Sequence, residues 1–148
     1  MRTLLATLLF ALSLSATAQQ PKLDGNTLDG QRFSLDALRG KVVMLFFWNT
    51  DCVPCLQKMP ELRANAMGWR GKPFELVLVS TDRDRAAALG YLQTLKQIEK
   101  NGRPMPSLWA GDLRFGAPLA APMAVPLTLV IDAKGAIVAR HEIGRAHV

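Results

Sequence analysis

The stretch that decides the fold is residues 42–55, VVMLFFW-NTD-CVPC. Its first seven residues, Val42–Trp48, are all apolar, and a strand that is apolar on both faces belongs inside a covered sheet. Cys52-x-x-Cys55 follows after three polar residues, and the apolar spacing beyond it predicts a helix from Cys52 to about Gly68. The sequence therefore predicts a buried strand that leads into a helix with two cysteines in its first turn.

Strands alternate with helices on the C-terminal side of this stretch. The runs Phe74–Ser80 and Leu127–Ile131 predict two more buried strands. A helix capped by Asp82 or Asp84 is expected to extend to about Lys100. This alternation predicts an α/β fold with a parallel core and helices on its faces.

Shorter elements complete the expected chain. They are a hairpin at Leu28–Phe33 with an Asp-Gly turn, a helical turn at Ser34–Leu38, a short strand near Ser107–Trp109, and a strand at Ala136–Arg140. Residues 101–125 are rich in Pro and Gly and are otherwise expected to be irregular. No internal repeat divides the chain, so its 148 residues predict one domain.

Composition excludes several classes of protein. Two cysteines are too few for a disulfide scaffold or a four-thiolate zinc site, and two histidines exclude a three-histidine metal site. The net charge of +6 is scattered in single residues or pairs, with no basic run interleaved with aromatic residues. We therefore expect no nucleic-acid partner.

The N-terminus, residues 1–18, has the pattern of a secretory signal peptide. Arg2 supplies a short positive region, Leu4–Leu14 is mostly apolar, and Ala16-Thr17-Ala18 matches a cleavage site. The apolar run is shorter than the roughly 20 residues that cross a bilayer. We expect cleavage before Gln19 and no stable membrane insertion afterwards.

The C-terminal residues 143–148, IGRAHV, match the in-frame translation of a common sequencing-adapter oligonucleotide. We interpret them as an artefact that follows a native chain cut at about Glu142, so the domain at residues 19–142 is expected to be truncated at its C-terminus; in the alternative, residues 143–148 are a short native tail. His147 is therefore not counted as a ligand or a base.

Cys52 and Cys55 carry the expected chemistry. Two cysteines three residues apart on the first turn of a helix can form a disulfide, and the free N–H groups there favour thiolate. We expect Cys52 to be the exposed nucleophile and Cys55 the shielded resolving thiol, in a thiol–disulfide oxidoreductase that needs no cofactor beyond this redox-active pair.

The same two cysteines are compatible with other functions. A structural disulfide would close a tiny loop and stabilise little. A copper(I)-binding or copper-assembly module is chemically reasonable, although Met59 has the spacing of a core residue. Zinc lacks further ligands, so no metal site is predicted. A peroxiredoxin-like peroxidase is not favoured, because Asn49 stands where that class has a Thr or Ser three residues before its nucleophilic cysteine.

Val125-Pro126 directly precedes the third buried strand. Proline is tolerated at the first position of a strand. A cis bond here would turn the chain and offer the Val125 backbone to an extended substrate, whereas a plain trans proline would do neither. The base rate of cis X-Pro bonds is about 5–6%.

Together these motifs resemble the TlpA/ResA-type periplasmic thioredoxin-like proteins. The resemblance runs from about Leu23 to His141 and rests on FWNTDCVPC with Met59-Pro60-Glu61-Leu62, the lead-in Leu38–Val42, and Val125-Pro126-Leu127-Thr128. It implies a thioredoxin-like fold with an N-terminal hairpin extension and a mixed central sheet flanked by helices. It also implies a cis Val125–Pro126 bond that faces the cysteines and binds substrate.

The same resemblance implies disulfide exchange with protein substrates in the periplasm, usually as a reductant supplied with electrons by a membrane partner. Two residues depart from it. Asp51 stands where the family usually has Trp and should oppose thiolate at Cys52, while Lys58 stands where the family often has Glu and should favour it. The family also continues into a C-terminal helix that this sequence lacks before residue 143.

Overall fold

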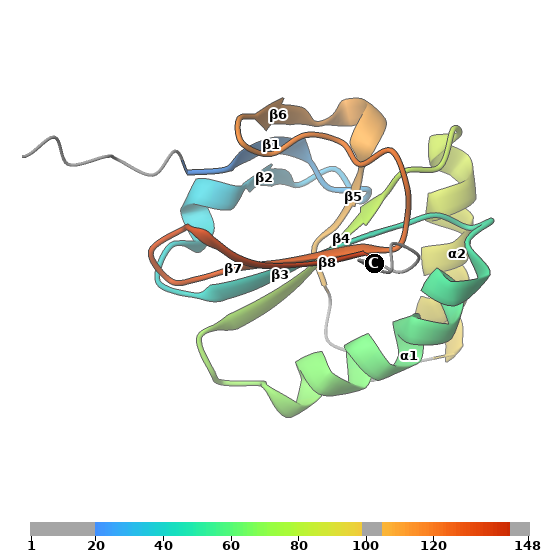
Figure 1. Cartoon of the computed structure of the whole chain (residues 1–148). Helices are drawn as coiled ribbons and strands as arrows, with labels where there is room; N and C mark the ends of the chain where they lie inside the picture. Colours follow the sequence, from blue (N-terminus) through green and yellow to red (C-terminus); the bar gives the residue numbers. More distant parts are fainter. Residues whose placement is uncertain (1–19, 99–104, 143–148) are drawn as a thin grey trace, which may run out of the picture.

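The computed structural model describes residues 20–98 and 105–142 (Figure 1). The expected signal peptide, the last residues of the helix expected to reach Lys100, and the segment 143–148 lie outside the described residues, so these expectations stay predictions. Within the described ranges, no helix combines the length and the apolar character needed to cross a bilayer.

A five-stranded mixed sheet forms the centre of the described structure, with strand order β5-β4-β3-β7-β8. Its strands are β3 (Val42–Trp48), β4 (Phe74–Ser80), β5 (Ser107–Trp109), β7 (Leu127–Ile131) and β8 (Ile137–Glu142). β3 pairs parallel with β4 and antiparallel with β7. The predicted strands are confirmed, and the strand expected at Ala136–Arg140 extends to Glu142.

β3 lies in the middle of this sheet because its side chains are apolar in both directions. Successive residues of a strand point to opposite faces. Val43, Leu45 and Phe47 belong to one core cluster, whereas Phe46 and Trp48 belong to another. Both faces of the sheet are therefore covered over β3.

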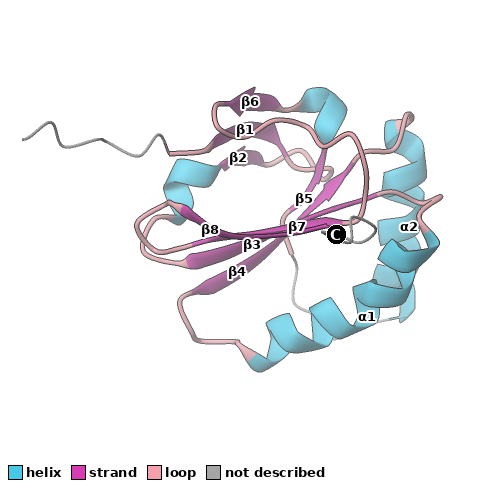
Figure 2. Ribbon diagram, in the orientation of Figure 1, coloured by secondary structure: helices cyan, strands magenta, loops and turns pink. Residues whose placement is uncertain are grey.

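The two helices, α1 (Val53–Gly68) and α2 (Arg85–Ile98), contribute to the same core cluster. We expected helices on both faces of the sheet, and this expectation is wrong for the described residues. From β3 to β4 to β5 the chain moves in one direction across the sheet, so right-handed crossovers place both helices on one face. In Figure 2, α1 lies on the side of the five-stranded sheet away from the smaller sheet, and α2 runs beside α1.

A three-stranded antiparallel sheet covers the other face (Figure 1). It consists of β1 (Lys22–Asn26), β2 (Arg32–Ser34) and β6 (Arg114–Gly116), with the 3-10 turns η1 (Leu35–Leu38) and η2 (Ala110–Asp112) beside it. Leu23, Phe33 and Leu35 pack in one cluster with the inner residues of β3. The expected N-terminal hairpin is confirmed, but its first strand, Lys22–Asn26, lies before the predicted range Leu28–Phe33. β6 was not expected, because three residues that include Gly116 carry no strand pattern.

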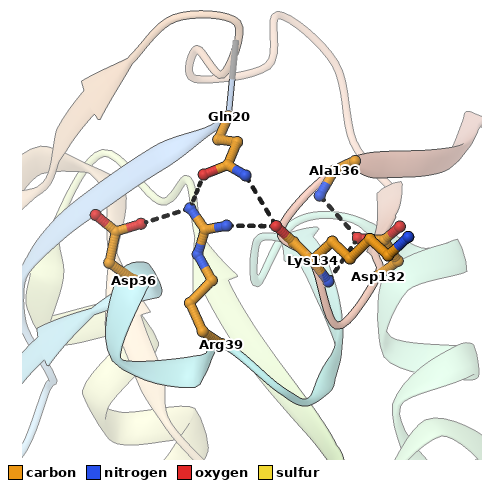
Figure 3. A network of polar contacts seen from close by, with 6 residues as sticks. All are labelled: Gln20, Asp36, Arg39, Asp132, Lys134 and Ala136. Carbon is orange, nitrogen blue, oxygen red and sulfur yellow. Dashed lines mark hydrogen bonds and ion pairs between the residues drawn. The ribbon is translucent and has the colours of Figure 1, made fainter. Parts of the chain in front are cut away.

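Arg39 ties three distant parts of this layer together (Figure 3). Its guanidinium donates to the Lys134 carbonyl, to the Gln20 side chain and to the Asp36 carboxylate, the last at 3.0 Å. Gln20 also donates to the Lys134 carbonyl at 2.9 Å. Hydrogen bonds at Arg39 therefore join the start of the described chain, η1 and the β7–β8 turn.

A substitution in the β7–β8 turn tests the contribution of these hydrogen bonds to stability. Gly135 has a φ of +86°, and a Cβ there would meet the Arg39 guanidinium, whereas Gly30 has a φ of +87° with open space around it. Alanine at either position costs about 1 to 2 kcal/mol for the left-handed backbone. We expect Gly135→Ala to lower the free energy of unfolding by about 1 kcal/mol more than Gly30→Ala, because it also breaks hydrogen bonds of Arg39.

Urea unfolding of the two variants measures this difference. In an Arg39→Ala background the two alanine substitutions should cost the same, because the group that the Cβ displaces is gone. An excess cost of Gly135→Ala that survives in that background would contradict the role given to Arg39.

Candidate active site

Cys52 lies at the N-terminus of α1, just beyond the carboxyl end of β3. Residues 49–51 connect Trp48 to Cys52, which is the N-cap of α1 with an extended backbone. The Cys52 Sγ accepts a hydrogen bond from the Cys55 backbone N–H at 3.2 Å. Pro54 occupies the first turn, where its missing N–H costs nothing. The cysteine sulfur therefore takes the place of the oxygen that usually caps a helix.

The two cysteines form a disulfide, with their Cα atoms 5.2 Å apart. Cys52 is partly exposed, whereas Cys55 is 0% exposed. The predicted difference in exposure is thus present in the structure. Solvent and a partner protein reach only the first sulfur, which fits a nucleophile followed by a resolving thiol.

Cys55 is enclosed by the core cluster on the helix side of the sheet. Phe46, Trp48 and Met59 belong to this cluster, and each is at most 2% exposed. The core position expected for Met59 from its spacing is confirmed. In the described part of the chain, no group of three or more His, Cys, Asp or Glu residues is placed to hold a metal ion.

The peptide bond between Val125 and Pro126 is cis, as the family resemblance implied. Leu127 of β7 pairs with Phe47 of β3, so the chain before it passes beside Trp48 and the loop that leads to Cys52. Val125 and Cys52 pack against the same core cluster. The structure thus brings the Val125–Pro126 segment to the cysteine end of the sheet, while its role in substrate binding stays a prediction. A second cis bond, Ala117–Pro118, was not foreseen.

Asp51 and Lys58, the two residues expected to tune the cysteines, have different surroundings. Asp51 is exposed, next to Cys52 in the chain. Lys58 forms an ion pair with Glu61 at 2.8 Å. It also lines a cavity of about 200 Å³ together with Pro126, and Asp51 does not. The apolar walls of this cavity come from Met44, Phe46 and Leu62.

Asp82 is a site residue that the sequence did not reveal. Asp82 or Asp84 was expected to cap the second helix, and Asp84 does so by accepting from the Ala86 N–H at 2.9 Å. Asp82 instead accepts from the backbone N–H of Thr50, in the loop before Cys52, at 2.9 Å. The only sequence signal was the polar triplet Ser80-Thr81-Asp82 directly after an apolar strand.

The sequence matches the redoxin family profile over residues 14–145. The chain therefore belongs to the redoxin family. Among its relatives is a thiol-disulfide oxidoreductase ResA from Bacillus anthracis, which is 26% identical over 121 residues, covering 81% of this chain and 65% of the relative. Another ResA, from Bacillus cereus, is 28% identical over 75 residues, covering 51% of this chain and 43% of the relative. The family resemblance expected from the motifs is confirmed.

The matches span less than two thirds of these relatives' own length. A short segment of 44 residues is 46% identical to the thioredoxin-like protein YneN of Bacillus subtilis, covering 30% of this chain and 26% of the relative. The similarity thus covers only part of each relative. The activity of the whole relatives is therefore applied to this chain only as a proposal.

Solved structures confirm the thioredoxin-like fold. A thiol:disulfide interchange protein of the thioredoxin family from Chlorobium tepidum superposes with a TM-score of 0.66 at 23% identity, covering 88% of this chain and 90% of that one. A thiol:disulfide interchange protein from a Bacteroides species gives a TM-score of 0.60 at 22% identity, covering 82% and 77% of the two chains.

The charges near the cysteines lead to a prediction for the reduced protein. Asp51→Ala removes a negative charge beside Cys52 and should shift the pH midpoint of Cys52 alkylation downward. Lys58→Ala should shift it upward by less, because Glu61 already offsets the Lys58 charge at 2.8 Å. Iodoacetamide labelling against pH, read by mass spectrometry, measures both midpoints.

Glu61→Gln is the matched control, since it removes the partner of Lys58 and leaves the cation. It should shift the midpoint in the same direction as Asp51→Ala. Three unchanged midpoints would mean that solvent and salt screen these charges from the sulfur.

Proposed function

We propose that this protein is a thiol–disulfide oxidoreductase that acts on protein disulfides through Cys52 and Cys55. The observation that carries the proposal is a disulfide at the N-terminus of a helix, with one sulfur partly exposed and the other fully buried. The names of the ResA relatives support it.

The exchange begins from the reduced protein. The Cys52 thiolate attacks one sulfur of a substrate disulfide, forms a mixed disulfide and releases the other substrate sulfur as a thiolate. The N–H groups at the start of α1 stabilise the attacking thiolate, because they carry partial positive charge and include the Cys55 N–H that reaches Sγ. This step replaces one disulfide bond and one thiolate by another disulfide bond and another thiolate, so it needs no cofactor.

The second step resolves the mixed disulfide. Cys55 loses its proton and attacks the Cys52 sulfur, which re-forms the Cys52–Cys55 disulfide and releases the second substrate thiol. Two electrons have then passed from the protein to the substrate. Because Cys55 is 0% exposed, it can attack the neighbouring Cys52 sulfur but is shielded from disulfides in solution.

The direction and place of this reaction are further parts of the proposal. We infer that the protein works as a reductase in the periplasm, is exported by the signal sequence in residues 1–18, and receives electrons from a membrane dithiol protein. The signal-like N-terminal pattern and the ResA-type relationship support these assignments.

Substitution of each cysteine tests the division of roles. Cys52→Ser should abolish exchange with a protein disulfide, because the accessible nucleophile is gone. Cys55→Ser should still attack and should accumulate a mixed disulfide. Non-reducing electrophoresis with a disulfide-bonded substrate such as insulin shows the trapped adduct.

A copper titration of the unmodified protein separates catalysis from copper binding. Tight, stoichiometric copper(I) in an anaerobic titration of the reduced protein, together with no exchange activity, would favour the copper module instead. Release of substrate by Cys55→Ser at the rate of the unmodified protein would show that the roles are assigned wrongly.

The proposed direction leads to a prediction for the redox potential. A reductase should have a Cys52–Cys55 potential near the −270 mV typical of thioredoxin, whereas an oxidant lies near −120 mV. Equilibration with dithiothreitol or glutathione buffers, followed by thiol-specific mass labelling, measures the potential. A value near −120 mV would keep the exchange chemistry and overturn the direction.

A further inference from the structure

The loop that carries Cys52 is held by a residue from another part of the chain. We propose that Asp82 is a positioning residue: by binding Thr50 it fixes the loop before Cys52 and keeps the nucleophilic sulfur at the N-terminus of α1. This inference rests on the proposed function and adds a residue to its site.

Asp82 binds the loop through both the main chain and a side chain. One carboxylate oxygen accepts from the Thr50 backbone N–H at 2.9 Å and from the Thr50 hydroxyl at 2.6 Å. Hydrogen bonds to an ionised carboxylate are shorter and stronger than those between neutral groups. Thr50 lies only two residues before Cys52, so this clamp sets the path by which the chain enters the helix.

Asp82 is itself held in place by β4, through its carboxylate, and by β5, through its main chain. Its other carboxylate oxygen accepts from the Ser80 hydroxyl at 2.7 Å, and Ser80 is 0% exposed. The Asp82 carbonyl accepts from the Trp109 indole N–H at 2.7 Å. A group fixed on two strands can impose a geometry on a loop, which a mobile surface acid could not do.

Neighbouring residues form further hydrogen bonds between the loop before Cys52 and the loop after β4. The Thr81 N–H donates to the Trp48 carbonyl at 2.7 Å, at the last residue of β3. The Asn49 amide donates to the Thr81 hydroxyl at 3.5 Å. Further along, the Cys52 N–H donates to the Asn49 carbonyl at 3.3 Å. Trp48, Asn49 and Thr50 are thus hydrogen-bonded to Thr81 or Asp82, and Cys52 is linked to them through Asn49.

The position of the sulfur matters because thiolate is stabilised only close to the helix end. The favourable interaction with a helix N-terminus falls off within the first turn. At present the Cys52 Sγ lies 3.2 Å from the Cys55 nitrogen. If the loop relaxes, the sulfur leaves this N–H and the thiolate fraction at neutral pH falls.

Positioning and direct charge effects of Asp82 have opposite signs, so they can be separated. Loss of a nearby negative charge alone would favour thiolate at Cys52 and shift its alkylation midpoint downward. Loss of positioning shifts the midpoint upward. An asparagine at this site keeps an oxygen for Thr50 and can donate to Ser80, whereas an alanine keeps neither.

The experiment compares Asp82→Ala, Asp82→Asn and Asp84→Ala in the fully reduced protein. Iodoacetamide labelling of Cys52 against pH is read by mass spectrometry. We expect Asp82→Ala to shift the midpoint upward by about one pH unit, which lowers the rate of labelling about tenfold at pH values below the midpoint. Asp82→Asn should restore most of that rate. Asp84→Ala removes the same charge from the same loop without touching Thr50, and should leave the rate near that of the unmodified protein.

Thr50→Val keeps the experiment decisive if Asp82→Ala fails to fold. It removes only the hydroxyl donor, and we expect an upward shift in the same direction but smaller. A downward shift in both Asp82 variants, or no shift in Asp82→Ala and Thr50→Val, would overturn the proposal. Labelling with iodoacetamide needs no substrate, so these outcomes stand whether or not the protein exchanges disulfides with insulin.

Discussion

The burial of β3 on both faces is the constraint on which the rest of the structure depends. A strand with no polar face has to lie between two layers, and here the layers are the small sheet on one side and the two helices on the other. Each large apolar side chain buried in this way contributes about 1.5 to 3 kcal/mol. Because β3 is fixed by β4 and β7 on its two edges, its carboxyl end is a rigid point from which the cysteine loop starts.

The helix that follows from this point gives the two cysteines different exposure to solvent. Cys52 is the N-cap and therefore lies at the surface, where the free N–H groups of the helix are. Cys55 lies one turn further along, four residues before Met59, on the side of α1 that packs against the sheet. The packing of one amphipathic helix thus produces an accessible sulfur and a protected one, without any additional catalytic group.

This chain shares its scaffold with the redoxin family and with the solved structures. The residues around its cysteines form specific local contacts. Asp51 and Lys58 place opposite charges near the motif, and Glu61 offsets the second of them. Pro126 and Lys58 share a cavity with apolar walls on the helix side of the sheet. The clamp between Asp82 and Thr50 ties the cysteine loop to β4. We expect these local contacts to influence how readily Cys52 ionises.

Elements whose signals are local could be predicted from the sequence. The apolar run of β3, the helix spacing after Cys52, and the Cys52-x-x-Cys55 pair at the strand-to-helix junction were all predicted, because each depends on residues that are neighbours in the chain. The tertiary structure alone decided which distant residues meet. β6 pairs with β1 across about 90 residues, both helices cover one face, and Asp82 binds Thr50 instead of capping α2. Strand order and crossover direction set these contacts, and side-chain periodicity along the chain carries no record of either.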